Sequence, residues 1–190
     1  MAIVHGFDQP ERFVAGTVGE PGARTFFLQV RDAGRVVTVA AEKQQVDVLA
    51  DRVDELLDEV MQAVGSETTV PALAPFDLED NDPLDLPFDE EFRAGTMTLS
   101  WDPEDELVVI EVYPIDAELP DDLLEGEDDE LPAEEMLLVR LTPGYARSFV
   151  ARARRVVGAG RPTCPFCGAP IDPEGHLCVR ANGFKRRDPV

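Results

Sequence analysis

Four residues near the carboxy-terminal end of the sequence have the types and the spacing of a metal site. Cys164 and Cys167 are separated by two residues, and His176 and Cys178 follow them closely. Thiolate and imidazole suit the borderline-soft character of Zn²⁺, which binds four such ligands in a tetrahedron. Because these four side chains would fill every coordination position, the pattern predicts a structural zinc site rather than a catalytic one.

The cysteines allow two other interpretations. A redox-active Cys-x-x-Cys pair needs its first thiol at the start of a helix, and Pro165 and Pro170 disfavour a helix in this segment. Reduced thiols without a metal are the other alternative. We favour zinc, because the sequence has 3 cysteines and all of them lie here, whereas disulfide pairing would leave one unused. The metal would also supply the folding free energy of a segment too short to form a core.

Arginines on both sides of the cysteines form a second candidate site. The following six belong either to a predicted helix or to the carboxy-terminal segment: Arg152, Arg154, Arg155, Arg180, Arg186 and Arg187. Guanidinium groups bind phosphate and carboxylate in a bidentate manner. We therefore predict a basic patch that binds an anionic ligand. A solvated face that balances nearby acidic residues is an equally open alternative.

Other residues give little indication of chemistry. His5 is the only histidine left once His176 binds metal, and we expect it to be solvated or to cap an element rather than to act in catalysis. The acidic stretch 121–130 lacks the alternating ligand positions of an EF-hand loop, so we expect a solvated loop. The sequence also contains no Gly-rich phosphate loop with its lysine.

The overall charge limits the classes of partner. A formal net charge of -22 opposes binding to nucleic acid or to an anionic membrane surface, because both repel such a protein at long range. No window approaches the roughly 18 consecutive apolar residues of a membrane-spanning helix. The first residues lack the basic flank and the apolar run of an export signal. We therefore expect a cytoplasmic protein with no membrane partner.

A folded domain must carry these candidate sites, and hydrophobic periodicity indicates its elements. Runs rich in β-branched and aromatic residues predict strands, and apolar residues at intervals of three and four predict helices. The expected strands are 11–18, 25–31, 35–41, 96–101, 107–113 and 136–141. The expected helices run from about 46 to Gly65, and from Thr142-Pro143 to Gly158.

The order of these elements predicts the organisation of the chain. Residues 1–160 are expected to form one α+β domain with acidic loops at about 66–91 and 116–135, and residues 161–190 a zinc-binding tail. Each half of the domain contains three strands and a helix. We therefore expect two three-stranded meanders, each followed by a helix, which points to a βββα duplication with a small zinc knuckle appended.

Three segments together resemble a known family. They are the opening Gly6 to Gly16 (GFDQPERFVAG), the stretch Glu42-Lys43-Gln44-Gln45, and the ending from Cys164 through His176 to Gly183. They are similar to the DUF3090 family of actinobacterial proteins, and the resemblance spans essentially the whole chain. That family is uncharacterised, and its members tend to be encoded beside a histidine-phosphatase-like and a kinase-like protein. The resemblance therefore implies a role near phosphoryl chemistry without assigning an activity.

Taken together, the sequence predicts a zinc-stapled cytoplasmic protein that acts by binding a protein partner or a small anionic, phosphorylated ligand. The first alternative is an enzyme of unrecognised type that acts on a phosphorylated metabolite. The second alternative is a nucleic-acid contact made by the zinc tail, which the net charge disfavours.

Overall fold

The computed structural model describes residues 3–20, 22–65, 69–119, 134–160, 164–167, 171, 178 and 180. The described residues form the following elements in chain order: β1 (Ile3–Asp8), β2 (Arg12–Val18), β3 (Thr25–Asp32), β4 (Arg35–Ala41), α1 (Lys43–Val64), the short 3₁₀ helix η2 (Phe76–Leu78), β5 (Glu90–Asp102), β6 (Leu107–Pro114), β7 (Glu135–Leu141) and α2 (Pro143–Gly158).

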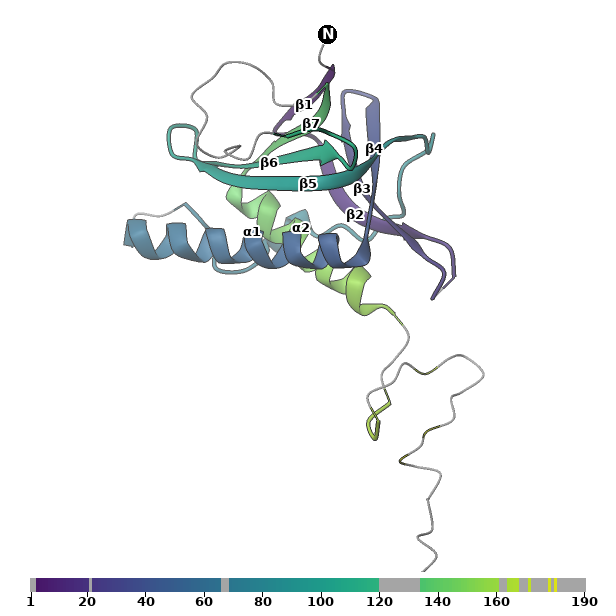
Figure 1. Ribbon diagram of the computed structural model, residues 1–190. Coiled ribbons are helices and arrows are strands. Elements are labelled where there is room, and N and C mark those ends of the chain that lie inside the picture. The colour runs from purple at the N-terminus through teal and green to yellow at the C-terminus, as the bar shows by residue number, and fades with distance from the viewer. Residues whose placement is uncertain are drawn as a thin grey trace, which may run out of the picture.

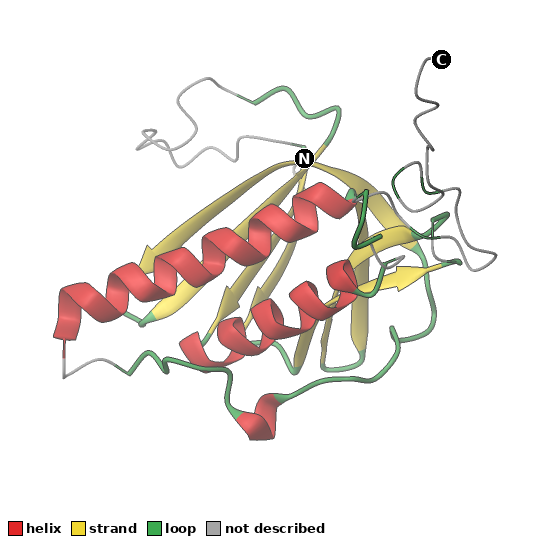
Figure 2. Ribbon diagram, turned by 90° about the horizontal axis from the view of Figure 1, so that it is seen from below, coloured by secondary structure: helices red, strands yellow, loops and turns green. Residues whose placement is uncertain are grey.

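All the strands join into a 7-stranded sheet in the order β1-β7-β6-β5-β4-β3-β2. β1 pairs parallel with β7, and β4 pairs parallel with the start of β5, whereas the other neighbours are antiparallel. Both helices lie side by side on one face of this sheet (Figure 1; Figure 2). The fold is therefore an α+β structure of two layers, with the core between the helices and the sheet. Among the described residues, no helix combines the length and the apolar character needed to cross a membrane.

Helix α1 has clear start and stop signals. Its side chains at Val46, Leu49, Val53 and other positions on the same face are buried, as the spacing of three and four residues requires. A reciprocal capping box between Glu42 and Gln45 satisfies backbone groups of the first turn. The helix ends at Gly65, which has a φ of 70°, a value that favours glycine.

Helix α2 follows β7 directly and completes the core. Thr142 caps the helix by accepting a hydrogen bond from the backbone N–H of Tyr145, and proline occupies the first turn. Its inner face includes Phe149, which stacks on Phe13 of β2 at a ring-centroid distance of 4.7 Å. Each fully buried side chain of this size contributes roughly 1.5–3 kcal/mol to stability, so the contact fixes α2 on the sheet.

The sequence prediction is correct for the α+β class, whereas the expected duplication is not supported. Strands β2 to β4 form one antiparallel meander that α1 follows, and β5 to β7 form another that α2 follows, but the parallel pairing of β4 with β5 joins them into one sheet. The halves also differ in detail: α1 has 22 residues and α2 has 16, and β5 has 13 residues whereas β2 has 7. Strand β1 was missed by the prediction, and it lies at the edge of the sheet beyond β7.

The predicted acidic loop at about 66–91 is largely described, and part of it crosses the molecule as a strap. We define the strap as residues 69–89. It runs along the side of α2 and past the edge strand β2 (Figure 2). Its ion pairs and hydrogen bonds with Arg12 of β2 and Arg152 of α2 hold it against both elements. The second predicted acidic loop, at about 116–135, falls mostly outside the described residues, which resume at position 134.

Candidate functional site

The three cysteines come together as the sequence predicts. The sulfur atoms of Cys164, Cys167 and Cys178 all lie within 4.8 Å of one another, and none of them forms a disulfide. The sulfurs of Cys164 and Cys178 are 3.6 Å apart. Two thiolates on one tetrahedral Zn²⁺, at about 2.3 Å each, would be about 3.8 Å apart. The spacing of the sulfurs therefore fits a single metal ion.

The local electrostatics favour thiolate, which is the form that binds metal. Burial acts to raise the pKa of Cys164, whose exposed fraction is 5%. Hydrogen bonds from the backbone N–H groups of Cys167 and Phe166, together with the neighbouring thiols, outweigh that effect and lower the pKa to about 6. The turn between the first two cysteines is thus arranged to stabilise negative charge on sulfur.

The fourth predicted ligand, His176, lies outside the described residues, and so do Arg186 and Arg187 of the predicted basic patch. Their roles remain predictions. Arg180 is described, and its guanidinium donates to the carbonyl of Phe166 at 3.2 Å, within the turn between Cys164 and Cys167. This contact connects the two sides of the cysteine cluster.

Arg152 is one of the predicted anion-binding residues, and the structure places it inside the protein. Its exposed fraction is 6%, its Nε donates to the carbonyl of Ala15 at 2.9 Å, and its guanidinium contacts the carboxylate of Asp80 and the carbonyl of Asp82. Burial lowers the pKa of Arg152, and the charge of Asp80 acts in the opposite direction. All these partners belong to the chain itself, so Arg152 fastens the strap to β2.

Arg154 and Arg155 are more exposed and are also paired within the chain. Arg154 binds Asp51 at 2.9 Å and Asp54 at 2.8 Å, both on α1. Arg155 binds Glu79 of the strap at 2.9 Å. An external anion would have to compete with these carboxylates. The predicted ligand-binding role of the arginines is not tested by this arrangement and stays a prediction.

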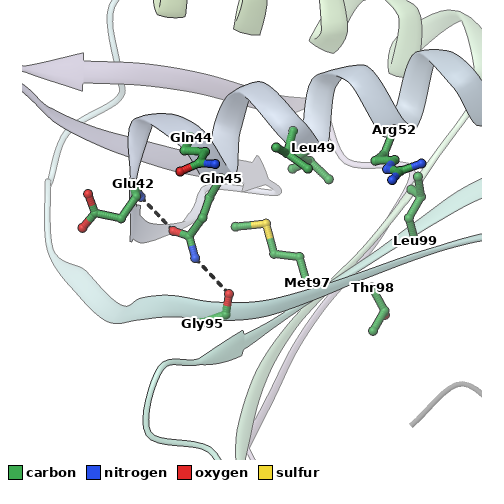
Figure 3. A pocket seen from close by; sticks show the side chains of 10 residues that line it. Glu42, Gln44, Gln45, Leu49, Arg52, Gly95, Met97, Thr98 and Leu99 are labelled. Carbon is green, nitrogen blue, oxygen red and sulfur yellow. Dashed lines mark hydrogen bonds between the residues drawn. The ribbon is translucent and has the colours of Figure 1, made fainter. Parts of the chain in front are cut away.

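A pocket of about 430 Å³ lies between the first half of α1 and the middle of β5 (Figure 3). Leu49, Met97 and Leu99 form its apolar part, and Gln45 closes one end by donating to the carbonyls of Ala94 and Gly95. The following residues also line it: Glu42, Gln44, Val48, Arg52 and Thr98. Its volume falls in the range of small-ligand sites, about 300–1,000 Å³. The sequence prediction missed this pocket, because it forms only when β5 passes under α1.

A second pocket, of about 380 Å³, lies between the strap and α2. Arg155 and Glu79 line it together with Phe76, whose side chain is 89% exposed. Ser148 also lines this pocket, and its buried hydroxyl has no hydrogen-bond partner among the residues that the structure describes. Unsatisfied buried hydroxyls are uncommon in folded proteins, which makes this pocket a candidate site for a polar ligand.

The expectation for His5 is wrong, because its side chain is buried rather than solvated. Its exposed fraction is 8%, its Nε2 lies 2.9 Å from a carboxylate oxygen of Glu135, and its Nδ1 lies 3.0 Å from the guanidinium of Arg35. A lone histidine close to the first residue gave no signal of this role. The partners are 130 and 30 residues away in the sequence.

Comparison with known proteins identifies a family and no function. Residues 5–178 match a family described as protein of unknown function (DUF3090). The match includes all three cysteines as well as His5 and His176. No curated protein and no solved structure matches the chain.

Proposed function

The chain belongs to the DUF3090 family, and from the geometry of its residues we propose that it is a zinc-stapled cytoplasmic binding protein. Its partner is a protein segment that docks in the pocket between α1 and β5. The single observation that carries this proposal is that pocket, an apolar concavity of about 430 Å³ within an acidic surface.

The zinc site has a structural role in this proposal. Cys164, Cys167 and Cys178 would supply three ligands, and His176 would supply the fourth, so no position is left for a substrate. Thiolate ligands select a borderline-soft ion such as Zn²⁺ over Mg²⁺ or Ca²⁺. Sites of this kind contribute on the order of 10 kcal/mol to folding. Cysteines that cluster as metal ligands rather than pair as disulfides are typical of a reducing, cytoplasmic compartment.

The chemistry of the pocket defines the partner. Its apolar residues can accept one or two apolar side chains, and Val48 on its rim is 49% exposed. The rim carries the exposed carboxylate of Glu42, and Arg52, which also lines the pocket, pairs with Glu55 at 3.0 Å. A segment with apolar anchors flanked by lysine or arginine would match both features. A polyanionic partner would be repelled by the net charge of -22.

Two valines of α1 provide a matched test. Val48 lines the pocket and Val64 lies at the far end of the same helix, and both are 49% exposed. A photo-crosslinking amino acid placed at position 48 should form a protein adduct in native extract that position 64 does not form. Val48→Glu should weaken capture of the adducted protein at least roughly tenfold, because it places a charged side chain among the apolar residues of the interface.

Val64→Glu serves as the control, because it adds the same charge outside the pocket. Equal capture by Val48→Glu and Val64→Glu, or the same adducts from positions 48 and 64, would rule out the pocket as the docking site. Unchanged melting temperatures of both variants would show that any loss of capture reflects binding and not folding.

The second candidate function is an enzyme that acts on a phosphorylated metabolite. The observation that favours it is the pocket of about 380 Å³ that Arg155 and Ser148 both line, the hydroxyl of Ser148 having no partner within the described part of the chain. A phosphate group could accept from both, provided that it displaces Glu79 from Arg155.

Inorganic phosphate is the probe for this second candidate. We expect saturable NMR shifts at Ser148 and Arg155, which Arg155→Gln should abolish and Arg154→Gln should leave in place. Arg154 is the matched control, because it is equally exposed on the same helix but pairs with α1 instead of the strap. A uniform, non-saturating response to phosphate would eliminate this candidate.

A further inference from the structure

A second cluster of metal-binding side chains lies far from the cysteines. His5 of β1, Glu91 of β5 and Glu135 of β7 each place one ligand atom within 4.8 Å of the other two. We propose that His5, Glu91 and Glu135 form a site for a divalent transition metal that keeps open coordination positions, and that Arg35, which contacts the other ring nitrogen of His5, opposes binding of the metal.

The sheet itself brings these residues together. β1 pairs parallel with β7, with Ile3 opposite Glu135, so His5, two residues further along, has its side chain on the same face as Glu135. Glu91 belongs to the first part of β5, and its neighbour Phe92 packs near His5 at a ring-centroid distance of 6.4 Å. Rigid strands therefore fix the positions of all three residues, which is what a metal site requires.

The hydrogen bonds of His5 define its protonation state without metal. A guanidinium only donates hydrogen bonds, so Nδ1 of His5 must accept from Arg35 at 3.0 Å. The ring proton then resides on Nε2 and is donated to Glu135 at 2.9 Å. In this state the positive charge of Arg35 offsets the negative charges of the two glutamates.

Metal binding requires a different arrangement of the same groups. A metal on Nε2 needs the ring proton on Nδ1, where it would face the N–H groups of Arg35. The side chain of Arg35 must then move away from Nδ1. The ring keeps one proton, which moves from Nε2 to Nδ1. Arg35 is exposed and lies over the ring of Phe7 at 4.8 Å, so its side chain can move without disturbing the core. Arg35 and the metal are therefore mutually exclusive partners of His5.

The ligand set also indicates which metals fit. One imidazole with two carboxylates suits Mn²⁺, Fe²⁺ or Zn²⁺, and donor atoms about 2.1 Å from such an ion lie about 3–4 Å apart. Three protein ligands leave positions open for water or a substrate group, in contrast to the cysteine site. Because Glu91 is exposed, an ion can reach the site from solvent.

Mn²⁺ binding to the full chain, with its cysteine site loaded with zinc, tests the proposal by electron paramagnetic resonance. His5→Gln and Glu135→Gln should weaken binding at least roughly tenfold, as expected for loss of one ligand. Glu134→Gln and Glu90→Gln remove the same charge from neighbouring positions and should change affinity less than about threefold.

Arg35→Gln is the decisive variant, because a gain of affinity cannot arise from misfolding. It removes a cation beside the site and should tighten Mn²⁺ binding roughly tenfold or more. Failure of both wild type and Arg35→Gln to bind millimolar Mn²⁺ would overturn the proposal. So would equal binding by His5→Gln, or weaker binding by Arg35→Gln. Val48→Glu should leave Mn²⁺ affinity unchanged, so this result is independent of the docking proposal.

Discussion

At the scale of single residues, Asp80 illustrates how buried charge organises this protein. Its carboxylate binds Arg12 of β2 and Arg152 of α2, which are only 5% and 6% exposed. Arg12 also binds Asp85 at 2.6 Å. Buried guanidinium groups are costly unless they are paired, so each depends on the strap for its partner. The strap is consequently part of the fold rather than a connection between parts of it.

Replacement of Asp80 by alanine should destabilise the protein by about 3 kcal/mol, because it leaves two buried arginines without their shared carboxylate. Urea unfolding followed by circular dichroism measures this change. Asp77→Asn, on the same strap but exposed, is the control and should stay within about 0.5 kcal/mol of wild type. A loss below about 1 kcal/mol for Asp80→Ala would show that water replaces the carboxylate.

The same residue predicts part of the pH dependence of stability. Burial acts to raise the pKa of Asp80, but the hydrogen bond from Arg12 and the charge of Arg152 outweigh it and lower the pKa below its ordinary value. The folded state therefore binds the proton less readily than the unfolded state. This stabilisation is complete above the unfolded pKa of about 4 and is lost as the pH falls through the lower folded pKa.

The free energy of unfolding, measured from pH 6 to pH 2, should therefore fall more steeply with decreasing pH for wild type than for Asp80→Asn. The variant starts from lower stability at neutral pH and no longer has this carboxylate to protonate. Parallel curves for the two proteins would mean that other carboxylates govern the acid transition.

At the scale of elements, the strap and β2 fit together through a glycine. A Cβ atom added to Gly16 would lie 2.5 Å from a methyl carbon of Leu84, which is closer than real contacts allow. Glycine at this position lets the strap approach the edge strand of the sheet.

Gly16→Ala should therefore destabilise the protein by about 1–3 kcal/mol through overpacking. Adding Leu84→Ala should recover part of that loss, and a double-mutant cycle measures the coupling between the two sites. Gly158→Ala is the control, because no atom lies within 4 Å of the added Cβ. Additive effects of Gly16→Ala and Leu84→Ala on the free energy of unfolding would show that Leu84 of the strap does not pack against Gly16.

At the scale of the whole molecule, the cysteine cluster and the hydrophobic core are separate. The core consists of side chains from the sheet, α1, α2 and the strap residue Val70, and none of the three cysteines belongs to it. The domain therefore does not depend on the metal for its apolar burial. The cysteine segment has no comparable apolar cluster among the described residues, so metal should account for its order.

Removal of metal should consequently affect one part of the chain. We expect a strong chelator to release one equivalent of zinc and to open the bond after Arg180 to trypsin, while the melting temperature of the domain changes by less than a few degrees. Elemental analysis and limited proteolysis measure these effects. Cys164→Ser should reproduce them without a chelator. Material that carries no stoichiometric metal when purified under reducing conditions would contradict the zinc assignment.

Local patterns in the sequence were sufficient to predict most of the helices and strands and the cysteine cluster. Periodicity and capping residues gave both helices correctly, and the spacing of Cys164, Cys167 and Cys178 predicted that their sulfurs converge. These features can be predicted because each depends on residues that are close together in the sequence. A helix face repeats every three or four residues, and the ligands of a metal knuckle are joined by a short loop.

Only the tertiary structure decided the rest, because those features depend on residues far apart in the chain. β1 is a strand by virtue of its pairing with β7, and His5 is buried only because Glu135 and Arg35 reach it. The composition of the stretch at about 66–91 indicated an acidic loop, yet buried arginines of β2 and α2 hold residues 69–89 of it as a strap. A carboxylate gains a partner when folding brings a distant arginine beside it. Local sequence patterns do not predict which arginine that will be.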